Sequence, residues 1–143
     1  MSDFRRLDEG LYASPQIDLD DLTEARAMGV VMVINNRPEG ESPDQTPGPV
    51  IEAAAREAGM DYRAIPITHA GFSAPQITAM AEALASADGA VLAYCRSGTR
   101  STLLWALAQA HEGRSPEELA HIAAAAGYDL TPIRPMMDVL AAH

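Results

Sequence analysis

The sequence of 143 residues has one cysteine, no lysine and few aromatic side chains. The single cysteine, Cys95, excludes a disulfide within the chain and leaves no second thiol to resolve an adduct on the first. Any group that forms on Cys95 must therefore leave to water or to an external thiol. No apolar stretch approaches the roughly 20 residues of a membrane span, and the charged start of the chain lacks the apolar core of a signal peptide. We therefore expect a cytoplasmic protein without membrane contact.

Positive charge is also scarce. The formal net charge is -10, from 20 acidic residues and ten basic residues, all of them arginine. Nucleic acids and anionic membranes require a basic surface, so we exclude both as partners. Two arginines, Arg96 and Arg100, nevertheless fall within five positions of Cys95. A small anionic substrate would be attracted to that local charge at close range.

Apolar periodicity predicts strands that alternate with helices along one domain, residues 1–143, in which 48% of the side chains are apolar. We expect strands at 11–13 (a short edge strand), 30–34, 62–67 and 90–94. Capping and glycine signals predict helices at 18–28, 51–58, 73–84, 102–112, 115–126 and 132–140. This order predicts an α/β fold of three layers, in which a mainly parallel central sheet has helices on both faces.

The segment around Cys95 is a strand-to-helix turn in this scheme. Backbone N–H groups converge at such a turn, and the positive end of the helix dipole faces the same point. Free cysteine has a pKa of about 8.5, which a helix N-terminus and nearby arginines lower to roughly 3.5 to 7.5. Cys95 is therefore predicted to be a nucleophile in an anion-binding loop, with Arg100 as the second catalytic residue.

Other residues of this loop are candidates for substrate contact: Arg96, Ser97, Gly98, Thr99 and Ser101. The Arg100 guanidinium offers a bidentate fork to an anion. Ser101, in the first helical turn, could donate a hydrogen bond to the sulfur. Gly98 is expected to allow a backbone angle or a close approach that a Cβ would block.

The 35–37 turn and the cysteine turn both follow the carboxyl ends of strands, and we expect these two turns to share one crevice. Arg37 and Glu41 are predicted to form a supporting ion pair or an anion contact. His69 could donate a proton to a leaving group, because histidine changes charge near neutral pH. The other histidines are too scattered to indicate a metal, and we expect no metal and no cofactor.

The string from Cys95 to Arg100 resembles the active-site loop of rhodanese-type sulfurtransferases, with four residues between cysteine and arginine. Tyrosine and dual-specificity phosphatases have five. Other strings are similar to a bacterial family of phosphatase-like domains, found alone or fused to β-lactamase-type hydrolases and sulfide-oxidising enzymes: 14–17, 35–41, 93–95 and 127–130. That resemblance covers nearly the whole chain and implies the tyrosine/dual-specificity phosphatase fold.

Three functions stay open at this point. The short loop should suit an outer sulfur better than a phosphoryl group, and residues 66–73 hold no carboxylate to protonate a leaving oxygen, a group worth roughly 10² to 10⁴ in rate. We therefore prefer a sulfurtransferase that moves sulfur from thiosulfate or a persulfide to cyanide or a thiol such as glutathione, through a Cys95 persulfide. A phosphatase-like hydrolase with a Cys95 phosphocysteine intermediate is the alternative. A non-catalytic anion-binding or partner-binding module is the third.

Overall fold

The computed structural model describes residues 3–142, and Met1, Ser2 and His143 lie outside this range. Its centre is a five-stranded sheet in the order β1-β2-β5-β3-β4. The strands are β1 Arg5–Asp8, β2 Leu11–Ser14, β3 Val30–Asn35, β4 Asp61–Ala64 and β5 Ala90–Tyr94. Only the pairing of β1 with β2 is antiparallel among these strands. The predicted mainly parallel α/β sheet is confirmed.

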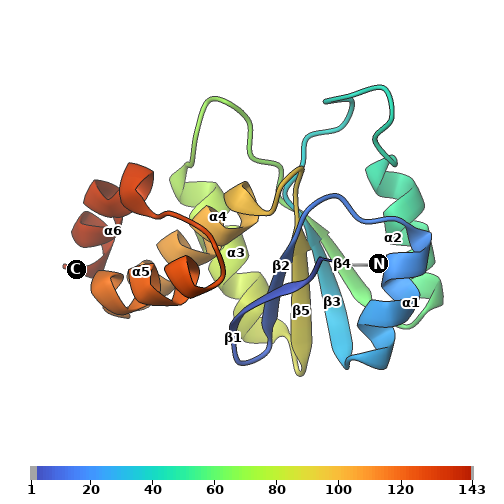
Figure 1. The fold of residues 1–143 in the computed structure, drawn as a ribbon, viewed down its shortest axis with the longest axis horizontal. Helices are drawn as coiled ribbons and strands as arrows, with labels where there is room; N and C mark the ends of the chain where they lie inside the picture. The colour runs from blue at the N-terminus through green and yellow to red at the C-terminus, as the bar shows by residue number, and fades with distance from the viewer. Residues whose placement is uncertain (1–2, 143) are drawn as a thin grey trace.

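Helices cover both faces of this sheet (Figure 1). One face carries α1 Leu19–Ala27 and α2 Gly48–Glu57. The other carries α3 Ala74–Ser86, α4 Thr99–His111, α5 Pro116–Ala125, the 3₁₀ turn Thr131–Ile133 and α6 Arg134–Ala141. Two separate apolar clusters fill the layers, because successive side chains of a strand point to opposite faces. In β5, for example, Leu92 packs with α1 and α2 while Ala93 packs with the larger group of helices.

Three strand predictions need correction. The sequence analysis missed β1, whose four residues Arg5–Asp8 include only one buried apolar side chain, Leu7. As a result β2 is not the edge strand that we expected, because it lies between β1 and β5. The strand expected at 62–67 ends at Ala64. Beyond it the backbone still donates from Ile65 N to Asn35 O at 2.9 Å, so the segment follows β3 without being a regular strand.

Helix α4 lies in the middle of one layer and is buried on nearly every side. Leu104, Trp105 and Leu107 are each at most 1% exposed. The helix packs on β2 and α3, and α5 and α6 cover its other side (Figure 1). A helix that is apolar all round is typical of such a buried position. Within residues 3–142, no helix combines the length and the apolar character needed to cross a bilayer.

The loops that follow β3 and β5 meet at one edge of the sheet. The two strands are neighbours, and Asn36 N donates to Tyr94 O at 2.8 Å just where they end. The β4 to α3 connection leaves from the same edge, with Ile67 N bonded to Asn36 O at 3.0 Å. The shared crevice expected from the sequence therefore has its walls in these three loops.

Candidate active site

Cys95 is the first residue after β5 and is fully buried. Its backbone N–H donates to Ser14 O at 3.3 Å, and Gln16 N donates to Arg96 O at 3.3 Å, so the loop lies along the segment that follows β2. The Gly98 N–H donates to Cys95 Sγ at 3.1 Å. Since α4 begins at Thr99, the sulfur lies at the positive end of that helix. Both features stabilise a thiolate.

Gly98 has the two properties expected of it. Its φ of +89° is in the left-handed region, where a Cβ is unfavourable. A Cβ at this position would also lie 2.3 Å from the Tyr128 hydroxyl oxygen. The glycine therefore provides both the turn and the room for Tyr128.

The Arg100 side chain is held in place by a carboxylate. Its Nη1 and Nη2 atoms donate to the two Glu41 oxygens at 2.7 and 2.8 Å, and Nη1 also donates to Ile67 O at 2.8 Å. These bonds to Glu41 raise the pKa of Arg100, and the nearby Cys95 sulfur raises it further. A guanidinium has five N–H donors, so the three bonds to Glu41 and Ile67 leave two donors for the thiolate or an oxyanion.

Glu41 lies between two arginines. Arg37 Nε donates at 2.8 Å to its Oε1 atom, which also accepts from Arg100 Nη2. The bonds from Arg100 and then from Arg37 lower the pKa of Glu41 to about 2, although burial acts in the opposite direction. Arg37 is 4% exposed and also donates to Gln16 Oε1 at 3.0 Å. Of the two roles predicted for Arg37, the structure shows the ion pair.

Ser101 does not make the hydrogen bond to sulfur that we predicted. Its hydroxyl is buried and donates to Asn36 Oδ1 at 2.8 Å, and Asn36 Nδ2 donates in turn to Ile65 O at 2.9 Å. Ser101 thus links α4 to the loops after β3 and β4. We did not predict this role for Asn36, although a polar residue directly after a buried strand is a signal for such a contact.

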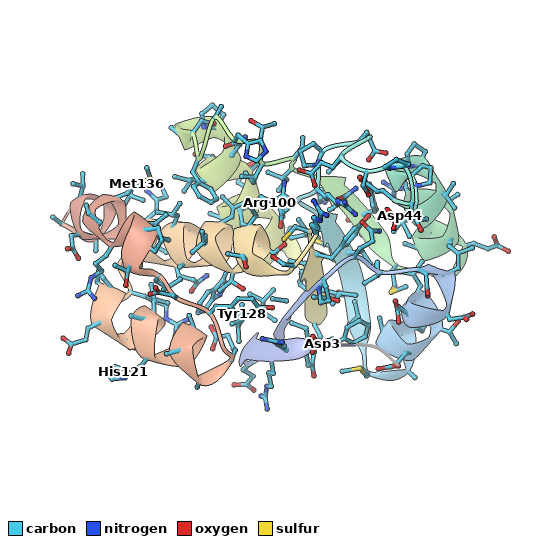
Figure 2. The ribbon with its side chains drawn as sticks, turned by 45° about the horizontal axis from the view of Figure 1, so that its top comes forward. Asp3, Asp44, Arg100, His121, Tyr128 and Met136 are labelled. Atoms are coloured by element: carbon cyan, nitrogen blue, oxygen red, sulfur yellow. The ribbon has the colours of Figure 1, made fainter. Side chains whose placement is uncertain are left out.

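A cavity of about 250 Å³ opens beside this network, lined by Glu41, Thr68, His69, Arg96 and Arg100. Arg100 lies both in this lining and near the buried Cys95 sulfur. The candidate residues Arg96 and His69 therefore lie together with Arg100 in one lining. Figure 2 shows Arg100 on the side of α4 that faces the loop bearing Asp44. Ser97 and Thr99 are exposed outside the lining and bond to each other at 3.0 Å.

The fold and this site define a class: a phosphatase-like domain with a cysteine at the turn from the central strand to a helix. Residues 3–112 match the family described as "Beta-lactamase hydrolase-like protein, phosphatase-like domain". The chain belongs to this family, as the resemblance implied. It is 35% identical over 125 residues, 87% of its length, to the beta-lactamase hydrolase-like protein of Xylella fastidiosa strain Temecula1. It spans 29% of that protein.

Solved structures support the same class. A protein of Neisseria meningitidis Z2491, provisionally described as a phosphatase, has a TM-score of 0.85 and 32% identity, over 98% of this chain and 99% of that one. Kinase associated phosphatase (KAP) has a TM-score of 0.73 at 19% identity, over 100% of this chain and 97% of that one, and shows the fold alone. The tyrosine/dual-specificity phosphatase fold is thus confirmed. Sulfur transfer, the preferred activity in the sequence analysis, has no support from these comparisons, which favour its phosphatase alternative.

Proposed function

We propose that this chain is a cysteine-dependent hydrolase of the phosphatase class that acts on small anionic phosphate esters. The observation that carries the proposal is the position of Cys95. Its sulfur accepts the Gly98 N–H at the start of α4, and Arg100 lies beside it with donors to spare. The family and the Neisseria relative support the same class.

The chemistry proceeds in two displacements. The Cys95 thiolate attacks phosphorus, the bond from phosphorus to the ester oxygen breaks, and the leaving alcohol or phenol takes up a proton. Water then attacks the phosphocysteine, releases phosphate and restores the thiolate. The loop N–H groups and the two remaining Arg100 donors would stabilise the charge on the equatorial oxygens during both steps. Glu41 keeps the Arg100 fork in one orientation, so less ordering is needed when substrate binds.

The proton source decides which esters are good substrates. Glu41 is the carboxylate in the cavity lining, and with a pKa of about 2 it is ionised at neutral pH and cannot donate a proton. His69 also lines the cavity, and we assign it this role. A histidine in an exposed loop should protonate the leaving group less effectively than a buried carboxylic acid. Aryl phosphates release a phenolate, and a phenol has a pKa of about 10, so they depend less on a proton donor. They should therefore be better substrates than alkyl phosphates.

Persulfide-forming sulfur transfer is the second candidate, favoured by the ionised state of Glu41. Sulfite leaves thiosulfate without taking up a proton. The rate of that reaction therefore does not depend on a protonated carboxylic acid, and none lines the cavity within residues 3–142. The acceptor would be cyanide or a thiol such as glutathione. A cytoplasmic location would supply that thiol.

One experiment compares the two candidates. Hydrolysis of p-nitrophenyl phosphate and of an alkyl phosphate is measured for the wild type and for Cys95→Ser, next to thiocyanate formation from thiosulfate and cyanide. We expect aryl phosphate hydrolysis to fall by at least about 10³-fold in Cys95→Ser, since the nucleophile is lost. Equal hydrolysis by both proteins would overturn the proposal. Thiocyanate formation without phosphate release would replace it with the second candidate.

A further inference from the structure

The peptide unit between Ser97 and Gly98 is bound at both of its polar groups. On one side the Gly98 N–H donates to Cys95 Sγ at 3.1 Å. On the other the Ser97 carbonyl oxygen accepts from the Tyr128 hydroxyl at 3.4 Å. A peptide unit is planar, so its N–H and C=O directions are fixed relative to each other. A contact at the carbonyl therefore also sets where the N–H points.

This peptide needs an external restraint because of Gly98. Glycine adopts positive and negative φ with similar ease, so rotation of the peptide, which would turn the N–H away from the sulfur, meets little local resistance. The Tyr128 hydroxyl lies beside the glycine, so close that a Cβ on residue 98 would be 2.3 Å from its oxygen. Residue 98 has no side chain that could restrain this peptide, so the contact with Tyr128 restrains it instead.

Tyr128 itself is firmly held. It is 7% exposed, and the Arg5 guanidinium lies 5.2 Å from the centre of its ring. Arg5 also donates to Ala126 O at 3.1 Å, which ties β1 to the end of α5. Burial raises the pKa of Tyr128, so the hydroxyl stays protonated and can donate. In Figure 2 the tyrosine lies on the opposite side of α4 from Arg100. It is not one of the residues that line the cavity beside Arg100.

We propose that Tyr128 is a positioning residue for the cysteine nucleophile: by holding the Ser97 carbonyl, its hydroxyl keeps the Gly98 N–H directed at Cys95 Sγ. It does so without contacting substrate. The residue lies beyond 3–112, the part of the chain that matches the family description. The inference rests on the proposed role of Cys95 as the nucleophile, but it concerns the thiolate alone.

The test is the pKa of Cys95 in Tyr128→Phe, which removes the hydroxyl and keeps the ring. Because the chain has one cysteine, carbon-13 labelling of cysteine Cβ gives a single resonance whose shift follows thiol ionisation. We expect the Cys95 pKa to rise by roughly half a unit to one unit, and the thiolate-to-thiol ratio at a given pH to fall about threefold to tenfold, the range of one neutral hydrogen bond. The Gly98 amide should also exchange faster with solvent.

The controls separate this effect from general damage. Tyr12→Phe removes a hydroxyl from β2 and should leave the Cys95 pKa unchanged. Arg100 and, behind it, Glu41 are the charged groups that face the sulfur from α4 and from the loop after β3, and both are intact in each variant. Arg5→Lys keeps the positive charge but removes the planar group from the ring, and a smaller rise in the same direction is expected. It also provides a test if Tyr128→Phe does not fold.

A folded Tyr128→Phe protein with the wild-type Cys95 pKa and the wild-type Gly98 amide exchange rate would overturn the inference. So would an unfolded Tyr128→Phe protein together with an Arg5→Lys protein whose Cys95 pKa is unchanged. No substrate enters these measurements, so their result is independent of whether phosphate ester hydrolysis is observed.

Discussion

Two loops meet at the candidate site, and they are held in different ways. The cysteine loop, residues 95–98, takes its shape from backbone groups and from one glycine with positive φ. The arginine loop, residues 37–47, takes its shape from side chains: Arg37 bonds to Glu41, and Gln45 bonds to Glu41 N and Pro38 O. The shape of the cysteine loop therefore depends mainly on the path of the backbone, whereas the shape of the arginine loop depends on charge. Acid should therefore disturb the arginine loop first.

The largest expected effect is the loss of the charge on Glu41. Glu41→Gln removes the carboxylate from between Arg100 and the buried Arg37, so both guanidinium groups keep only neutral hydrogen-bond partners there and lose their ion pair. Breaking a buried ion pair costs about 3 to 5 kcal/mol, and since Glu41 is 19% exposed we expect about 3 kcal/mol of unfolding free energy to be lost. Urea denaturation measures this. Glu52→Gln is the control, because its ion pair with Arg56 is exposed and should change stability by less than about 1 kcal/mol.

A second effect follows from the pKa of Glu41. Its pKa in the folded protein, about 2, lies below its ordinary value of 4.5, so folding favours the ionised form. The stabilisation is complete above about pH 4.5 and is lost as the pH falls toward 2. Between these pH values the unfolding free energy of the wild type should fall by about 2 kcal/mol more than that of Glu41→Gln, which lacks the carboxylate. Parallel stability curves for the two proteins from pH 5 to pH 2.5 would contradict the ion-pair account of the arginine loop.

The third effect tests the cysteine loop. Gly98→Ala places a Cβ at φ +89° and 2.3 Å from the Tyr128 hydroxyl oxygen. Gly113→Ala, at the other end of α4, has φ +98° but no atom within 4 Å of the new Cβ. The unfolding free energy of both variants should fall by about 1 kcal/mol because of the backbone angle. That of Gly98→Ala should fall by about 1 kcal/mol more because of the contact with Tyr128. Thermal or urea unfolding gives the difference, and equal losses would show that the space around residue 98 is not limiting.

Local sequence predicted the cysteine loop well because its determinants are adjacent. A buried strand, a cysteine, a glycine and an apolar helix follow one another within a few residues, and together they indicate a strand-to-helix turn. The contact of the Tyr128 hydroxyl with Ser97 O, from 31 positions away, was not predictable in this way. The caps at Asp18 and Ser115 were predictable for the same reason. Strand β1 was not, since two arginines and one buried leucine carry no strand periodicity and the strand depends on its pairing with β2.

The rest of the site depends on contacts between residues far apart in the chain. Glu41 and Arg100 are 59 positions apart, and Ser101 and Asn36 are 65 apart. The sequence placed the turns after β3 and β5 at the same edge of the sheet, but it did not show which side chains pair across these loops. The same limit affected the functional prediction. Loop length and a missing carboxylate favoured sulfur transfer, whereas the family and the fold neighbours favour the phosphatase class.

The central position of α4 means that the similarity boundary and the cooperative unit of the protein do not coincide. The family match ends at residue 112, one residue after the helix that α5 and α6 cover. A fragment cut at that boundary would keep every residue that lines the cavity beside Arg100. It would nevertheless expose one side of α4, a helix most of whose side chains are buried in the whole chain, and this exposed apolar surface would promote aggregation. Helices α5 and α6 are therefore part of the folding unit that supports the candidate site, although they lie outside the family match.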